Sequence, residues 1–392
     1  MINLPEVLAA YNPKQITIGV LGGHSALEVC EGAKKLGFQT LVVAQKGREK
    51  TYEKYYRTRD GGKGCVDHLI TLDKFADIVK PEVQEELRGL NTIFVHNRYF
   101  WVYCDFKAIE NDFNVPIYGT RQLVRLEERD QPNNQYFLLE KAGIRIPKII
   151  RNGDSKVTGE ALSKVLDDYF VINKGGPMIV KVNEATRTYE RAFFVATSEN
   201  DYNQKSKQKI SNGEITQEAL DKAVIEEFII GAQVNLNFFY SPLTSELELM
   251  GTDMRRQTSL DGFLRLNAND QTLLLKSGYQ PSMVETGHVA VTMKESLLEK
   301  AFDIGEKFVK ATKEHAAPGI IGPFALQGAV AAENGREEFV IFDVSMRIPG
   351  SPGTRFTPYT SYLWGRPMSF GERLAMDIKE ALDAGRLGEI VT

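Results

Sequence analysis

Length, composition and charge restrict what the 392-residue chain can be. Its length predicts two or three domains with extensive hydrophobic cores. The 48 basic and 52 acidic residues leave a net charge of −4, so we do not expect a nucleic acid or a membrane as the main partner. No run of about 20 apolar residues predicts a membrane span, and no signal peptide is recognisable. The three cysteines are far apart and odd in number, which argues against disulfides or a zinc site and predicts a cytoplasmic protein.

The chain opens with the pattern of a strand, a helix and a second strand. Residues 16–21 (ITIGVL) and 40–44 are apolar runs, and residues 26–36 between them predict an amphipathic helix. This βαβ pattern predicts a parallel sheet whose ligand site lies at the carboxyl ends of the strands. Residues 92–95 and 115–118 predict further strands of the same sheet.

A glycine-containing turn, Gly22-Gly23-His24-Ser25, joins the first strand to the helix. Adjacent glycines allow backbone N–H groups to approach an anion at the helix N-terminus. The pattern is not the GxGxxG of NAD-binding folds, and the later acidic residue of those folds is missing. His24 could be a capping or surface histidine. We favour a ligand role, because Lys46 and Arg48 follow the neighbouring strand at the same edge of the sheet.

A charged segment follows the predicted parallel sheet. Arg121, Arg125 and Arg129 recur every four residues, with Glu127 and Glu128 among them. On an α-helix the three arginines would share one face, and we predict that this face is solvated.

A second unit is predicted to begin near Asn134. Lys181 lies in the middle of an apolar strand, where a lysine either sits at a sheet edge with its amine in water or presents its charge to a phosphate. Glu226 and Glu227 can share a buried strand only if one meets a hydroxyl or an amine and the other faces water. Helices are predicted at residues 135–141 and 159–170, and strands at residues 144–149, 178–182, 192–196 and 223–230.

A third unit begins with residues 233–240 and 246–253, which alternate polar and apolar side chains and predict an antiparallel strand pair. Residues 295–314 predict an amphipathic helix, and we interpret His288 and His315 as structural or solvent-exposed. A charged cluster after the strand pair could bind an anionic substrate or be a solvated loop; it comprises Asp253, Arg255, Arg256, Ser259, Asp261 and Arg265.

The last strand pair carries the main functional signal. Apolar runs on either side of Asn334-Gly335 predict a buried β-hairpin over residues 324–348. Asp343, Ser345 and Arg347 alternate along its second strand and therefore share one face. Polar groups on an apolar strand need partners, and an oxygen-ligated cation together with phosphate oxygens would supply them.

Gln327, in the first strand of this hairpin, tests the metal hypothesis. A two-residue turn would pair Gln327 with Phe342 and direct Asp343 to the opposite face. A three-residue loop or a β-bulge would pair Gln327 with Asp343, and we therefore predict an odd loop or a bulge. A buried ion pair between Asp343 and Arg347, without a metal, is the alternative, and the spacing alone favours neither.

Several long stretches of the sequence resemble one protein family. They include GGHSALEVCEGAKKLGF, EKAGIRIPK, IEEFIIG, GPFALQ and FDVSMR. With these stretches the chain resembles the ATP-grasp ligases and, over nearly its whole length, the archaeal FAICAR (5-formaminoimidazole-4-carboxamide ribonucleotide) synthetases. The resemblance implies an α/β (α+β) ATP-grasp fold. It also implies a Rossmann-like domain at residues 1–130, a small subdomain at residues 131–231 and a large subdomain at residues 232–392.

The resemblance further implies a reaction of purine biosynthesis. ATP would phosphorylate formate, and the amine of AICAR (5-aminoimidazole-4-carboxamide ribonucleotide) would capture the formyl phosphate. Such chemistry relies on a metal ion and cationic clamps. By resemblance, the ligands of Mg²⁺ (or Mn²⁺) are Gln327 and Asp343, and the catalytic residues are Lys181 and Arg347. The residues implied for ATP are Lys181, Glu226, Glu227, Ile229 and Gln233, and those for the AICAR-like nucleotide are His24, Ser25, Tyr99 and Ser259. A homo-oligomer is also implied.

Some positions depart from the family pattern. The stretch 183–191, after the lysine-bearing strand, contains no glycine, although close backbone approach to phosphate generally requires glycine. Arg98 or Tyr99 replaces a small residue, Ser259 replaces an asparagine, and Asp343 stands where a glutamate is usual. Despite these departures, the resemblance makes a ligase of the FAICAR synthetase type the first hypothesis. The alternatives are an ATP-grasp ligase for a different carboxylate and amine, and a catalytically silent nucleotide-binding partner protein.

Overall fold

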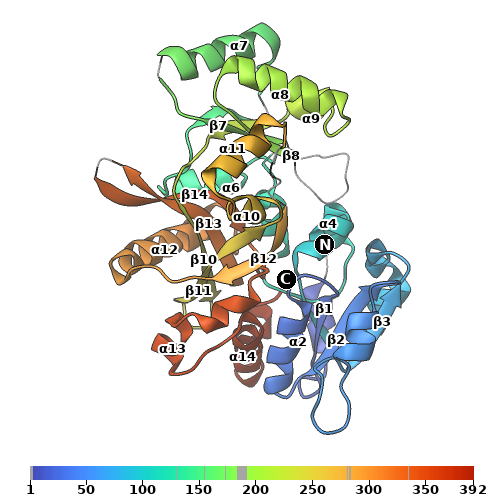
Figure 1. Cartoon of the computed structure of the whole chain (residues 1–392). Helices are drawn as coiled ribbons and strands as arrows, with labels where there is room; N and C mark the ends of the chain where they lie inside the picture. The colour runs from blue at the N-terminus through green and yellow to red at the C-terminus, as the bar shows by residue number, and fades with distance from the viewer. Residues whose placement is uncertain are drawn as a thin grey trace.

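In this computed structural model the described residues form three β-sheets, which follow one another along the sequence (Figure 1). The structure describes residues 3–129, 131–153, 155–172, 174–182, 192–279, 281, 284–333 and 335–392. One parallel and two antiparallel sheets, each packed against helices, confirm the predicted mixed α/β class. Over the described residues, no helix has both the length and the apolarity needed to cross a membrane.

The first unit is built on the predicted parallel sheet. All five residues of its central strand, β1, are buried, because helices cover both faces of the sheet. The strand order reverses between β1 and β4, so the turns that follow these two strands open into one crevice. In spatial order the strands are β3 (His68–Leu72), β2 (Gln39–Gln45), β1 (Thr17–Leu21), β4 (Thr92–Val95) and β5 (Ile117–Tyr118), of which β3 was not predicted.

Helices from both ends of the chain cover this sheet. Helix α14 (Phe370–Asp383) lies beside α2 (Figure 1), and the two approach so closely that a Cβ on Gly371 would lie 1.9 Å from the carbonyl oxygen of Glu28. Thr392 exchanges backbone hydrogen bonds of 2.8 and 3.0 Å with Ile117 at the sheet edge. The N-terminal helices are α1 (Leu4–Ala9), α2 (Ala26–Lys35), η1 (Thr51–Tyr55), η2 (Phe75–Val79), α3 (Pro81–Gly89), α4 (Arg98–Tyr103) and α5 (Phe106–Asn111).

A small antiparallel sheet forms the second unit. Its strands, in spatial order, are β6 (Ile149–Arg151), β9 (Val224–Glu227), β7 (Met178–Val182) and β8 (Ala192–Ala196). Strand β7 therefore lies inside the sheet, which contradicts the interpretation of Lys181 as an edge residue. The predicted strand at 144–149 is wrong except for Ile149. One side of the sheet packs on α7 (Gly159–Asp167), η4 (Asp168–Ile172), α8 (Glu199–Ser211) and α9 (Gln217–Asp221).

A larger antiparallel sheet forms the third unit. One face packs on α12 (Leu298–His315) and α6 (Gln135–Lys141), so the stretch around α6 shares the core of this sheet. The opposite face carries the polar side chains of the site. The strands, in spatial order, are β12 (Glu285–Ala290), β11 (Glu246–Gln257), β10 (Ala232–Ser241), β13 (Gly322–Glu333) and β14 (Arg336–Ser345). The remaining helices are η3 (Arg121–Glu127), α10 (Leu260–Phe263), α11 (Ala268–Lys276), η5 (Glu295–Leu297), η6 (Pro352–Phe356), α13 (Tyr359–Trp364) and η7 (Leu387–Glu389).

Candidate functional site

A cavity of about 2120 Å³ lies where the three sheets meet. The turns after β1 and β4 form one wall, the small sheet forms another, and the polar face of the large sheet forms the third. Ser259, at the start of α10, is the predicted site residue that does not line the cavity, so the structure does not bring it to the other positions. The predicted residues that do line it are His24, Ser25, Tyr99, Lys181, Glu226, Glu227, Ile229, Gln233, Gln327, Asp343 and Arg347.

A β-bulge sets the register of the hairpin that carries the predicted metal ligands. Glu333 pairs with Arg336 at the turn, yet Gln327 pairs with Asp343 because the register shifts between Gln327 and Gly328. This confirms the predicted bulge. The shift leaves Phe342 without a cross-strand partner. Its carbonyl oxygen instead accepts hydrogen bonds from three side chains, those of Lys181 (3.1 Å), Tyr136 (3.2 Å) and Arg129 (3.2 Å).

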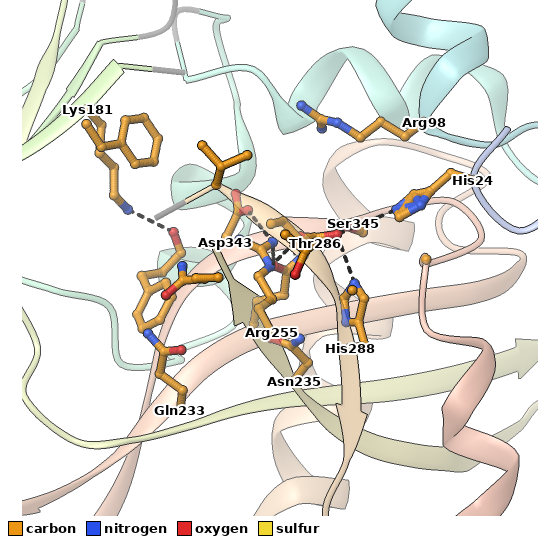
Figure 2. A pocket seen from close by; sticks show the side chains of 18 of the residues that line it. His24, Arg98, Lys181, Gln233, Asn235, Arg255, Thr286, His288, Asp343 and Ser345 are labelled. Carbon is orange, nitrogen blue, oxygen red and sulfur yellow. Dashed lines mark hydrogen bonds and ion pairs between the residues drawn. The ribbon is translucent and has the colours of Figure 1, made fainter. Parts of the chain in front are cut away.

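Because of this register, one row of polar side chains crosses four strands of the large sheet. Asp253, Asn235, Gln327 and Asp343 lie directly opposite one another in that order. The amide oxygen of Gln327 accepts a hydrogen bond from the guanidinium of Arg255, whose Nη2 lies 3.7 Å from Asp343 Oδ2 (Figure 2). Two oxygens from neighbouring strands thus already face one common cation.

Asp343 and Arg347 do not pair with each other, so the predicted alternative to a metal site is wrong. Asp343 Oδ1 lies 2.9 Å from Arg129 Nη2. The guanidinium of Arg347 lies 3.4 Å from Glu127, whose other oxygen accepts a 2.6 Å hydrogen bond from the backbone N–H of Met346. Both acidic side chains therefore have their own arginine.

The prediction of a solvated charged face at residues 121–129 is also wrong. Arg121, Glu127 and Arg129 are buried, and Arg129 and Glu127 line the cavity. The segment folds as a 3₁₀ helix, η3, in which residues four apart do not share a face as they would on an α-helix. Arg121 donates to four carbonyl oxygens, among them those of Phe113 and Thr392, and so is structural.

Lys181 connects the small sheet to the bulge of the large sheet. Its Nζ lies 2.5 Å from Glu226 Oε1 and 3.0 Å from the hydroxyl of Tyr136, which also bonds to Glu226. Burial lowers the pKa of Lys181 to about 8, although Glu226 opposes that shift. Glu227 is half-buried and accepts from the backbone N–H of Lys148 at 3.3 Å. This confirms that one glutamate meets an amine and a hydroxyl while the other is more exposed.

His288 belongs to the cavity wall, where it bridges two carboxylates. Its Nδ1 lies 2.5 Å from Asp253 Oδ2, and its Nε2 lies 3.0 Å from Glu285 Oε1. Burial opposes protonation, but hydrogen bonds to the two carboxylates outweigh it and raise the pKa of His288 to about 9. Burial raises the pKa of Glu285, but hydrogen bonding to His288 outweighs burial and lowers that pKa to about 2.

Of the three residues in this cluster, Asp253, Glu285 and His288, the sequence pointed only to Asp253 as a candidate site residue. Asp253 belonged to the charged cluster considered for anion binding, and it is held by Asn235 (2.9 Å) and Asn237 (2.6 Å) from β10. Strand β12, which carries Glu285 and His288, was not predicted. It is one of the two edge strands of the sheet and has no buried residue, so its apolar pattern is weak.

His24 lies on the turn after β1 and faces the same group. Its Nε2 is 4.0 Å from Glu285 Oε1. Burial lowers the pKa of His24 to about 4, and the charge of Arg347 acts in the same direction, so the imidazole is neutral near pH 7. The hydroxyl of Ser25 donates to the carbonyl oxygen of Pro349 at 2.6 Å. Tyr99 covers Gly23, where an added Cβ would lie 2.1 Å from its ring.

The predicted departure at the glycine-free stretch 183–191 lies outside the described residues. The departures at Arg98 and Tyr99 lie within them, and both side chains line the cavity. Ser259 lies outside the cavity wall, and the last departure, Asp343, lies opposite Gln327.

Comparison with known proteins gives matches over nearly the whole chain. Residues 18–150 match a family described as "Protein of unknown function (DUF1246)", and residues 201–392 match one described as "Domain of unknown function (DUF1297)". The chain is 38% identical over 391 residues to a 5-formaminoimidazole-4-carboxamide-1-(beta)-D-ribofuranosyl 5'-monophosphate synthetase of Methanothermobacter thermautotrophicus, covering 99% of this chain and 97% of that protein. It is 34% identical over 389 residues to the protein of that name from Methanocaldococcus jannaschii, covering 99% and 98%.

Solved structures share the fold. An IMP biosynthesis protein PurP from Thermococcus kodakaraensis matches with a TM-score of 0.68 at 25% identity, over 96% of this chain and 100% of that one. An N5-carboxyaminoimidazole synthetase from Staphylococcus aureus, solved with ADP, matches with a TM-score of 0.56 at 13% identity, over 92% of this chain and 76% of that one. These neighbours confirm the ATP-grasp fold class.

Proposed function

The chain belongs to the family of 5-formaminoimidazole-4-carboxamide ribonucleotide synthetases, and on that premise we propose that it is an ATP- and formate-dependent ligase of IMP biosynthesis. In the proposed reaction a formate oxygen attacks the γ-phosphorus of ATP, and ADP leaves. The amine of AICAR then attacks the formyl carbon, phosphate leaves, and the amine gives up a proton to yield FAICAR. Positioning and charge stabilisation supply most of the catalysis in such reactions.

Gln327 and Asp343 are the proposed ligands of Mg²⁺ or Mn²⁺. Their oxygens face the guanidinium of Arg255, so the pair accommodates a positive charge between the two strands. An amide oxygen and a carboxylate oxygen form a donor set that suits these ions. The bound ion would offset the charge of the ATP phosphates. Arg255 keeps a partner in that state, because Glu285 Oε2 lies 3.1 Å from its Nε.

Lys181 and Arg347 are the proposed catalytic cations. Each is oriented by a buried carboxylate, Glu226 for Lys181 and Glu127 for Arg347. Fixed cations of this kind stabilise charge without reorganising during the reaction. The residues that follow Glu226 along the cavity wall are the proposed ATP contacts, namely Glu227, Ile229 and Gln233.

His24 and Tyr99 are the proposed contacts of the AICAR-like nucleotide. The neutral imidazole of His24 can accept a hydrogen bond, which a protonated ring could not. Ser25 remains a proposed contact through its backbone, because its hydroxyl is already bonded to Pro349. Ser259 lies outside the cavity wall, and we no longer propose that it contacts the substrate.

The pairing of Gln327 with Asp343 across the bulge is the observation that carries this proposal. The proposed function is tested by incubating the purified chain with MgCl₂, ATP, formate and AICAR and measuring ADP and FAICAR. We expect both products in equal amounts, and neither when formate is omitted. Failure to form FAICAR while ADP appears with formate would contradict AICAR as the acceptor.

A second candidate is an ATP-grasp ligase that joins a different carboxylate to a different amine. The observation that favours it is the bulk of Arg98 and Tyr99 in the cavity wall, where the family pattern has a small residue. The same ADP assay, repeated with other carboxylates and amines, distinguishes it. ADP release that depends on a carboxylate other than formate would support this second candidate.

The cellular setting of the proposed enzyme stays a prediction. All three cysteines are unpaired, which suits the reducing cytoplasm. A homo-oligomer is proposed from the family resemblance alone. The proposed partners are small molecules.

A further inference from the structure

Cations are abundant in the cavity wall, and most of them are paired with a carboxylate. Lys181 and Arg347 have Glu226 and Glu127. Arg48 lies at the exposed rim, where its guanidinium rests on the rings of Phe75 and Tyr103. The other pairs in the wall are Arg129–Asp343, Arg255–Glu285, Lys205–Asp201 and Lys209–Glu214.

Arg98, the first residue of α4, differs from these cations. Its side chain lines the cavity and is half-buried. No hydrogen bond or ion pair reaches its guanidinium from any residue that the structure describes, whereas the arginines deeper in the wall have partners. Figure 2 shows the side chain extending from α4 toward the side of the cavity that holds Lys181 and Asp343. A partly desolvated guanidinium whose N–H groups have no hydrogen-bond or ion-pair partner is unfavourable until an anion binds it.

The fold fixes where this anion would lie. Arg98 follows β4 and His24 follows β1, and these strands flank the point at which the sheet order reverses. Asn97 ties the two turns together, because its amide donates to the carbonyl oxygens of Leu21 (2.8 Å) and His24 (2.9 Å). Ligands of such sheets bind in this crevice.

The guanidinium of Arg98 also interacts electrostatically with Asp343, one of the proposed metal ligands. Burial lowers the pKa of Arg98, with the charge of Arg347 acting in the same direction and those of Glu127 and Asp343 opposing it. An arginine remains protonated in such surroundings. Arg98, His24 and the proposed metal pair all line the one cavity in which an activated carboxylate would pass from ATP to the amine.

We propose that Arg98 binds the carboxylate substrate of the ligase reaction and then holds the acyl phosphate formed from it. The planar guanidinium can contact two oxygens of a carboxylate or a phosphate at once, which an amine or a small residue cannot do. The inference rests on the proposed function, since it concerns the substrate that ATP activates. It assigns the acyl-substrate subsite to the wall formed by α4.

Steady-state ADP release with varied formate, at saturating ATP and AICAR, tests this assignment. Arg98→Ala should raise the KM for formate by about tenfold to a hundredfold, because a charged hydrogen-bond donor is lost. The KM for ATP should not change, and Arg98→Lys should lie between Arg98→Ala and the wild type. The matched control is Arg88→Ala in α3, outside the cavity, which removes a half-buried arginine bonded to the carbonyl oxygen of Asn114 and should leave both KM values unchanged.

The outcomes separate the inference from the proposed function. If the wild-type chain releases no ADP with formate, the proposed function fails and this assignment fails with it. If the wild type is active and Arg98→Ala keeps the wild-type KM for formate, the assignment alone is wrong. A rise confined to the KM for AICAR would also overturn it, since Arg98 would then hold the nucleotide. Circular dichroism of each variant establishes that the fold is retained.

Discussion

Lys181 and Glu226 form a buried ion pair at the point where the small sheet faces the bulge. Tyr136 and the carbonyl oxygen of Phe342 complete the environment of the amine. Removal of one partner from such a pair leaves an uncompensated buried charge. Breaking the pair would therefore destabilise the fold as well as disturb the proposed binding of phosphate.

We predict that Lys181→Met abolishes ATP-dependent turnover and lowers the free energy of unfolding by about 3–5 kcal/mol, because Glu226 remains buried without its partner. Urea unfolding measures this change. The double variant Lys181→Met/Glu226→Gln should recover part of the loss. Lys222→Met, which removes one partner of an exposed pair with Glu218, is the control and should change little. Equal stability of Lys181→Met and the wild type would refute the prediction.

His288 gives the fold a predicted dependence on pH. Its pKa is raised from an ordinary 6.5 to about 9 in the folded protein. The folded state therefore binds the proton more tightly than the unfolded chain. The resulting stabilisation is fully present below pH 6.5 and is lost as the pH rises through about 9.

The comparison of His288→Gln with the wild type isolates this contribution, since glutamine keeps a donor but cannot titrate. The wild type should exceed the variant in free energy of unfolding most strongly at about pH 6, and the difference should shrink by about pH 10. Urea titrations at both values measure it. A difference that is the same at the two values would mean that His288 does not carry the proton.

The sequence predicted the site residues that lie on recognisable strands and turns. It did not predict the charged partners that reach the site from distant segments. His24, Lys181, Gln327 and Asp343 lie on strands or turns with clear patterns, and all four line the cavity. It missed the partners that hold charge in place, because ion pairs such as Arg129–Asp343 join segments far apart in the sequence. Arg255 belonged to the charged cluster considered for anion binding, and the other missed residues are Glu127, Glu285 and His288.

At the scale of elements, the bulge in the last hairpin is the feature on which the site depends. The Asn334-Gly335 pair in the sequence indicates a short turn, and Glu333 and Arg336 do pair beside it. Nothing local marks the extra residue, Phe342. An odd loop or a bulge, at no stated position, was predicted only because Gln327 and Asp343 had to share a face. The requirement that Gln327 and Asp343 share a metal thus predicted the correct pairing, whereas the Asn334-Gly335 turn alone would have paired Gln327 with Phe342.

Gly328 allows that bulge. A Cβ at this position would lie 2.3 Å from the carbonyl oxygen of Val340, a backbone atom that cannot move freely. We predict that Gly328→Ala lowers the free energy of unfolding by about 1–3 kcal/mol and reduces ADP release, because the strands must separate or change register. Thermal unfolding and the ADP assay measure both effects.

The control for this variant is Gly89→Ala, at the end of α3, where an added Cβ would meet no atom within 4 Å. It should retain wild-type stability and activity. If Gly328→Ala behaves as Gly89→Ala does, the bulge does not require glycine.

Other elements show why some patterns predict well and others do not. The predictions at 92–95, 178–182 and 192–196 coincide with β4, β7 and β8, because short apolar runs between polar segments leave little choice of boundary. Strands β3 and β12 are partly exposed edge strands, so their apolar pattern is weak. Segment 121–129 was misread because a four-residue spacing was taken for an α-helix.

At the scale of the whole molecule, the cavity exists because three units close around it. The first sheet supplies His24 and Arg98, the small sheet supplies Lys181, and the large sheet supplies Gln327 and Asp343. Helix α14 and the last residues return to the first sheet, which ties the large unit to the Rossmann-like one. In the proposed reaction the first unit would thus hold the acyl and nucleotide groups, while the other two units would hold the ATP phosphates and the metal, all facing one space.

The most direct test is ADP release by Asp343→Asn in the presence of Mg²⁺, formate and AICAR. Asparagine can still accept the hydrogen bond of Arg129 but loses the charge that the proposed metal requires, so we expect a decrease of at least about a hundredfold with an unchanged circular dichroism spectrum. Asp383→Asn, which alters an exposed carboxylate paired with Lys379, is the control and should keep wild-type activity. Wild-type ADP release by Asp343→Asn would contradict the account.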